Sequence, residues 1–68
     1  MANIEMLRTT IDESGMTIVS IAKKSGIKRG TLYNRMAGVG EFTASEIVGL
    51  SEALNLTKAT RDKIFLQK

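Results

Sequence analysis

A chain of 68 residues without cysteine or histidine forms at most one small domain, and it lacks the ligands for disulfides, zinc fingers and imidazole catalysis. Hydrophobic residues make up 43% of the chain and charged residues 25%, which is typical of a folded globular domain. No apolar run reaches the roughly 18 residues of a membrane-spanning helix, and the first residues do not resemble a signal peptide, so we expect a cytoplasmic protein.

The net charge of +3 is unevenly distributed along the chain. Residues 14–40 contain no acidic residue, whereas the segment before them is acidic and the segment after them is neutral. The cations of this basic block are Lys23, Lys24, Lys28, Arg29 and Arg35. Such a block indicates a surface that meets a polyanion, although a merely solvated basic face is the alternative interpretation of the charge alone.

Two short helices are expected in the first 26 residues, because apolar residues recur there every three or four positions. The first ends at Gly15, which suits a left-handed C-terminal stop. The second follows Thr17, whose hydroxyl suits an N-cap, and it ends at Gly26 after about two turns. The apolar stripes consist of Ile4, Leu7 and Ile11 in the first helix and of Ile18, Ile21 and Ala22 in the second.

Three further helices are expected before the end of the chain. The third ends at Gly38, the fourth opens with a capping box formed by Thr43 and Glu46, and Thr57 caps the fifth. Their apolar residues are Leu32 and Met36, then Ile47, Leu50 and Leu54, then Ile64, Phe65 and Leu66. No strand pattern, linker or repeat is visible, so the sequence predicts an all-α compact bundle of about five short helices in a single domain over residues 1–68.

Residues 17–37 have the pattern of a helix-turn-helix. The second and third expected helices are joined by residues 25–28, which read SGIK and place Gly26 where positive φ is needed. The third helix is basic, and the major groove of DNA, about 12 Å wide, admits one helix. We therefore predict that the third helix is a recognition helix that enters the major groove.

A resemblance to the lambda-repressor-like (Cro/C1-type) helix-turn-helix family is carried by residues 16–54, which read MTIVSIAKKSGIKRGTLYNRMAGVGEFTASEIVGLSEAL. The similarity extends over roughly residues 3–66, and it is nearest to short Cro-like repressors of phages and prophages of low-GC Gram-positive bacteria. It implies a sequence-specific transcriptional regulator that occupies a double-stranded DNA operator and obstructs polymerase.

The resemblance also implies which residues contact DNA. Base contacts fall to the start and outer face of the recognition helix, at Lys28, Arg29, Gly30, Tyr33 and Asn34. The guanidinium of Arg29 matches the hydrogen-bonding edge of guanine, although Arg29 could instead contact a phosphate. The amide of Asn34 matches the edge of adenine, although Asn34 could instead be an ordinary solvated residue. For Gly30 the alternatives are close approach of the backbone to DNA and a tolerated surface glycine. Phosphate contacts are implied for Thr17, Lys24, Thr31 and Arg35.

Two positions depart from the family pattern. Ile18 stands where the family usually has a glutamine that braces the phosphate contact. Lys28 stands where serine or threonine commonly caps the recognition helix, so no side-chain cap is expected there.

The working form is expected to be a symmetric homodimer on a palindromic operator, because one recognition helix contacts too few base pairs for discrimination in a genome. Successive helical positions point about 100° apart, so one small core can hardly bury three consecutive apolar residues. The proposed dimer seam consists of Ile64, Phe65, Leu66 and Val48.

Other classes of protein receive less support. No nucleophile–base spacing, phosphate loop or metal-ligand cluster is visible, so an enzyme, a metal, a cofactor, a small-molecule ligand and a membrane partner are not expected. RNA binding is disfavoured because there are few aromatic residues for stacking on bases. A protein-interaction or antitoxin-type module stays the alternative, because the same fold can serve both uses.

Overall fold

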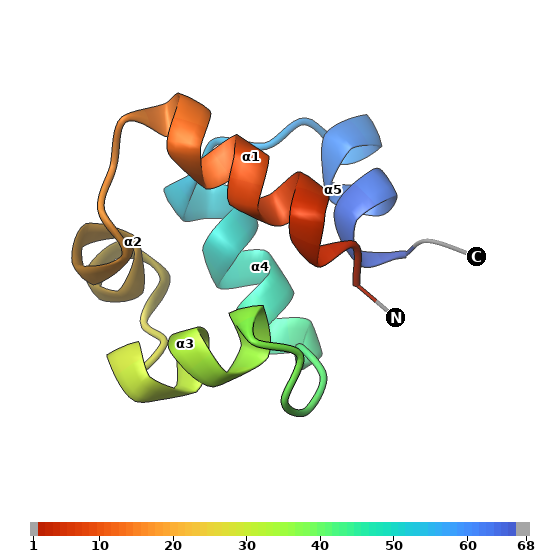
Figure 1. The fold of residues 1–68 in the computed structure, drawn as a ribbon. Coiled ribbons are helices and arrows are strands. Elements are labelled where there is room, and N and C mark those ends of the chain that lie inside the picture. Colours follow the sequence, from red (N-terminus) through yellow and green to blue (C-terminus); the bar gives the residue numbers. More distant parts are fainter. Residues whose placement is uncertain (1, 67–68) are drawn as a thin grey trace.

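The computed structural model describes residues 2–66, and this range holds five helices and no strand (Figure 1). The helices are α1 (Ile4–Ser14), α2 (Ile18–Ser25), α3 (Arg29–Met36), α4 (Ala44–Ala53) and α5 (Lys58–Phe65). The all-α bundle of five short helices that the sequence predicts is therefore confirmed.

Three of the helices begin at the threonines that the sequence identifies as caps. The hydroxyls of Thr17 and Thr57 each accept from the amide three residues further on, at 3.1 Å. Thr43 accepts from the amide of Glu46 at 3.2 Å, and the Glu46 carboxylate accepts in return from the amide of Thr43 at 2.9 Å, which completes the capping box. These bonds satisfy backbone donors that have no partner inside the helix.

The first two helices end at glycines in the left-handed region. Gly15 has φ 74° and Gly26 has φ 76°, values at which a Cβ atom would be strained. The amide of Gly26 donates to the carbonyl of Ala22 at 3.0 Å and closes α2. The chain can therefore turn sharply into α3.

The core takes one completely buried side chain from each helix. These residues, each with no exposed area, are Leu7, Ile21, Leu32, Leu50 and Ile64. Figure 1 shows α1 crossing α4, with α5 beside the start of α1 and with α2 and α3 on the other side of the molecule. Because each helix supplies a central residue, the position of α3 depends on all the others.

The end of α5 corrects part of the proposed dimer seam. Ile64 and Phe65, although consecutive, are both buried within one chain, with 0% and 6% of their area exposed. Phe65 packs edge-on against Phe42, which precedes α4, with ring centroids 5.3 Å apart. Ile64 and Phe65 therefore have almost no exposed area for a second copy to cover, and of the three consecutive residues only Leu66, which is 60% exposed, is left for a seam.

The two ends of the described chain lie side by side (Figure 1). The amide of Asn3 donates to the carbonyl of Ile64 at 2.6 Å and joins the start of α1 to the last turn of α5. Within residues 2–66, no helix has both the length and the apolarity to span a membrane.

Candidate nucleic-acid interface

The recognition helix α3 buries one face and exposes the other. Leu32 and Met36 point into the core, and Ile27, in the turn before the helix, is 8% exposed and fixes the turn to the same core. All five residues predicted to contact bases lie on the exposed side: Lys28, Arg29, Gly30, Tyr33 and Asn34. The fold therefore brings these five together on one continuous outward surface, starting at the first turn of α3.

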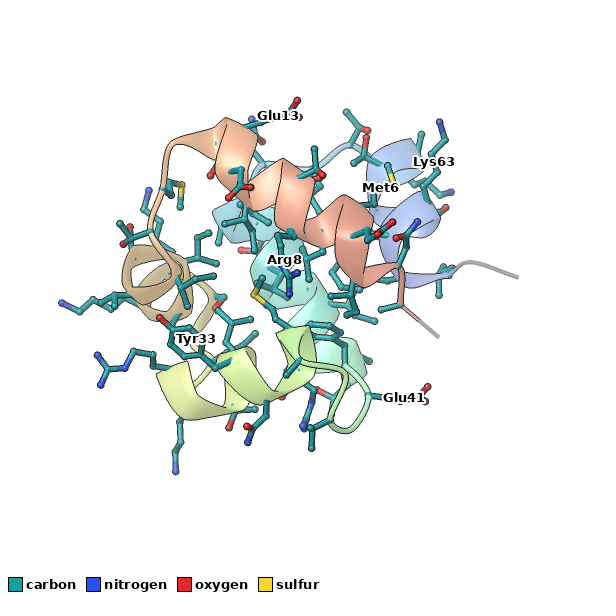
Figure 2. The ribbon with its side chains drawn as sticks, viewed as in Figure 1. Met6, Arg8, Glu13, Tyr33, Glu41 and Lys63 are labelled. Carbon is teal, nitrogen blue, oxygen red and sulfur yellow. The ribbon has the colours of Figure 1, made fainter. Side chains whose placement is uncertain are left out.

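The cations at the start of α3 are not neutralised by the rest of the described chain. Lys28 and Arg29 are exposed, and the ion pairs found within residues 2–66 involve neither of them. In Figure 2, Glu13 on α1 and Glu41 in the segment before α4 both lie away from the first turn of α3. Because these positive charges are unpaired and in contact with solvent, they can attract phosphates.

The start of α2 borders the same surface. Thr17 is exposed and lies with Ile18 and Tyr33 along a groove between α1, α2 and α3. Figure 2 shows Tyr33 on the side of α3 that faces α2. A helix N-terminus carries unpaired amides and partial positive charge, so this end of α2 suits an anion. Thr17 and Tyr33, predicted to contact phosphate and base respectively, thus line the same groove.

Two further residues predicted to contact phosphates, Lys24 and Thr31, lie on different helices of the helix-turn-helix. Lys24 is exposed in the last turn of α2. Thr31 is half-buried and borders a hollow that it shares with Lys28 and Ser45. Both side chains are therefore within reach of solvent on the helix-turn-helix.

Arg35 is directed toward α4 rather than toward the outward surface. Its Nε lies 3.4 Å from Oε1 of Glu46, and its Nη1 donates to the carbonyl of Val39 at 3.3 Å. A Cβ atom on Gly40 would lie 2.7 Å from Nη1, so the glycine leaves room for the guanidinium. Only 23% of the Arg35 side chain is exposed. In this structure Arg35 ties the end of α3 to the loop and to α4, and it does not join the other predicted contacts.

A second arginine holds the end of α3 from the opposite side. Nη2 of Arg8 donates to the carbonyl of Met36 at 3.3 Å, and Figure 2 shows Arg8 in the space between α1 and α3. A cation at a helix C-terminus satisfies a free carbonyl and interacts favourably with the helix dipole. The contact of Arg8 could not be predicted from the sequence, because the two partners are 28 positions apart and no local pattern links them.

The position of α2 depends on a close approach of α4. A Cβ atom on Gly49 would collide with the carbonyl oxygen of Ser25, the last residue of α2. An isolated glycine within a helical pattern is the one signal in the sequence that indicates such an approach. Gly49 therefore supports the interface from behind, by letting α4 lie directly against the helix-turn-helix.

A tight two-helix unit that presents an exposed cationic helix on a rigid support defines a helix-turn-helix protein of the DNA-binding class. A family model described as helix-turn-helix matches residues 4–60. The chain therefore belongs to the lambda-repressor-like (Cro/C1-type) helix-turn-helix family of DNA-binding regulators, which confirms the resemblance. No curated protein and no solved structure gives a significant match to it. Residues 2–66 contain no cluster of side chains that could hold a metal ion.

Proposed function

We propose that the protein is a Cro-like or repressor-like regulator of phage or prophage origin, which occupies a palindromic operator through the major groove and obstructs polymerase there. The observation that supports this proposal most directly is the outward surface of α3, where exposed Lys28 and Arg29 stand beside exposed Tyr33 and Asn34. Family membership supports DNA binding, and the exposed side chains support binding through this helix.

Within this proposal the base-reading roles follow from side-chain chemistry. The guanidinium of Arg29 donates two parallel hydrogen bonds to guanine O6 and N7, and the amide of Asn34 pairs with adenine N6 and N7. Lys28, Gly30 and Tyr33 contact neighbouring base edges. Phosphates on either side are held by Thr17, Lys24 and Thr31.

We propose further that two copies bind together, joined away from their recognition helices. Leu66 and Val48 are exposed by 60% and 54%, and they are the members of the expected seam that one chain leaves uncovered. Figure 1 places α5, which Leu66 directly follows, on the side of the molecule away from α2 and the start of α3, so a contact at Leu66 leaves the recognition helices free. Two-fold related helices then reach half-sites about 34 Å apart.

Selection of bound duplexes from a random pool tests operator binding. The expected product is one enriched site with two-fold symmetry and half-sites one helical turn apart, about 10 base pairs. The Arg29→Ala variant, selected in parallel, should lose the preference at one base pair in each half-site. No enrichment, together with recovery of a defined protein partner, would instead support an interaction module.

Two measurements test the seam. One is sedimentation equilibrium of the free protein at a concentration about ten times its Kd for DNA, and the other is the number of chains in the DNA complex. Leu66→Ser should shift either measurement toward the monomer. Val39→Ser is the matched control, since Val39 is equally exposed at 60% but lies in the segment between α3 and α4. A 1:1 complex on a non-palindromic site would contradict the dimer.

A further inference from the structure

Gly30 occupies the second position of α3, on the outward surface. A Cβ atom placed on it would meet no other atom within 4 Å, and its φ lies outside the left-handed region. A Cβ atom, and so an alanine, therefore fits here without strain or collision within the described chain. Alanine would favour the helix more than glycine does, because it has less backbone freedom to lose on folding.

The other five glycines each have a reason within the fold. Four of them have positive φ: Gly15, Gly26, Gly38 and Gly40. The fifth, Gly49, leaves room for the carbonyl of Ser25. Gly30 is thus the one glycine for which residues 2–66 provide neither a conformational nor a packing reason.

We infer that the reason lies in the DNA. Gly30 lets the backbone of α3 approach a base edge in the major groove, and it selects thymine there because the C5-methyl group takes the space of the missing Cβ. The N-terminal residues of a recognition helix are those that meet base edges, and thymine is the base whose edge projects a methyl group into the groove. This inference rests on the proposed function, and it identifies Gly30 as a specificity-determining residue that acts through its lack of a side chain.

The chain offers a matched control in Ala59. It is exposed and holds the second position of α5, as Gly30 does in α3, so the two sites share one helical environment. Gly30→Ala should raise Tm, and Ala59→Gly should lower it, each by about 2–5 °C. Only the change at Gly30 should alter binding to DNA, since α5 lies away from the start of α3 (Figure 1).

The experiment measures Tm and Kd for wild type, Gly30→Ala, Gly30→Ser and Ala59→Gly on the duplex that wild type selects. Gly30→Ala should weaken binding about tenfold or more despite its higher Tm, and Gly30→Ser should weaken it at least as much. Replacing the contacted thymine by deoxyuridine, which lacks the methyl group, should restore most of the affinity of Gly30→Ala.

Three results would overturn the inference. One is a lower Tm for Gly30→Ala, because the fold would then need the glycine. Another is an unchanged or tighter Kd for that variant, and the third is no recovery on the deoxyuridine duplex. If wild type itself selects no duplex, the proposed function fails and this inference fails with it; if wild type selects a site and Gly30→Ala binds it equally well, only the inference fails.

Discussion

The ion pair between Arg35 and Glu46 should stabilise the fold without contributing to the salt dependence of DNA binding. The perturbation is a double-mutant cycle of Arg35→Met, Glu46→Gln and both together. Methionine keeps most of the aliphatic stem of Arg35, and glutamine keeps the Oε1 that accepts from the Thr43 amide. The cycle therefore isolates the charge interaction from the capping box.

The magnitude follows from the geometry. At 3.4 Å, unit charges attract by about 5 kcal/mol for an effective dielectric constant near 20. The side chains of Arg35 and Glu46 are 23% and 15% exposed, so much of this attraction is offset by lost hydration. We expect a coupling free energy of about 1–2 kcal/mol, which lies between an exposed pair and a fully buried one.

Two assays measure the two parts of this prediction. Urea denaturation, followed by circular dichroism, gives the coupling free energy, and duplex titrations at several salt concentrations give the slope of log K. Arg61 and Asp62 supply a control pair, 3.1 Å apart but 36% and 39% exposed. Arg61→Met should therefore cost less than about 0.5 kcal/mol.

The slope decides between a structural and a DNA-binding role for Arg35. Each phosphate contact contributes about −0.9 to the slope of log K against log salt on duplex DNA. Arg35→Met should leave the slope unchanged while it lowers stability. A slope reduced by about 0.9 with stability retained would refute the reasoning and return Arg35 to the phosphate-contacting set.

Three further predictions follow from the packing and the outward surface. Gly49→Ala should lower the free energy of unfolding by about 1–3 kcal/mol, because its Cβ would collide with the Ser25 carbonyl; an unchanged urea midpoint would contradict this. Lys28→Ser should raise the free energy of unfolding by about 0.5–1 kcal/mol, because serine supplies the side-chain cap that α3 lacks, and thermal denaturation would show this. The same variant should bind duplex DNA more weakly. Arg29→Ala and Asn34→Ala should each cost about 1–3 kcal/mol on the selected site while non-specific affinity falls less, and unaltered base preferences in both would exclude α3 as the recognition helix.

Features of the fold that depend on neighbouring residues could be predicted from the sequence. The caps at Thr17, Thr43 and Thr57 and the stops at Gly15 and Gly26 each depend on a few consecutive positions, and all five are confirmed. The missing cap at Lys28 is confirmed for the same reason. Helical periodicity and local capping are thus sufficient for the order of the helices and for the helix ends that these residues mark.

Features that depend on distant residues could not be predicted. Phe65 is buried in contact with Phe42, 23 positions earlier in the chain, and the Arg8 contact requires α1 to lie close to the end of α3. Arg35 has the same chemistry whether it meets a phosphate or a carboxylate, so only the position of α4 distinguishes the two. The proposed base contacts at α3 stay predictions until they are tested with DNA.

The hydrogen bond between Asn3 and Ile64 brings the two ends of the domain together. A peptide attached at either end would therefore emerge from the same region, which Figure 1 places on the side of the molecule away from α2. This geometry suits tandem fusion, in which a flexible linker joins the end of one copy to the start of the next and raises their effective concentration. It also suits circular permutation, because a short loop could close the existing ends while new ones open elsewhere on the surface.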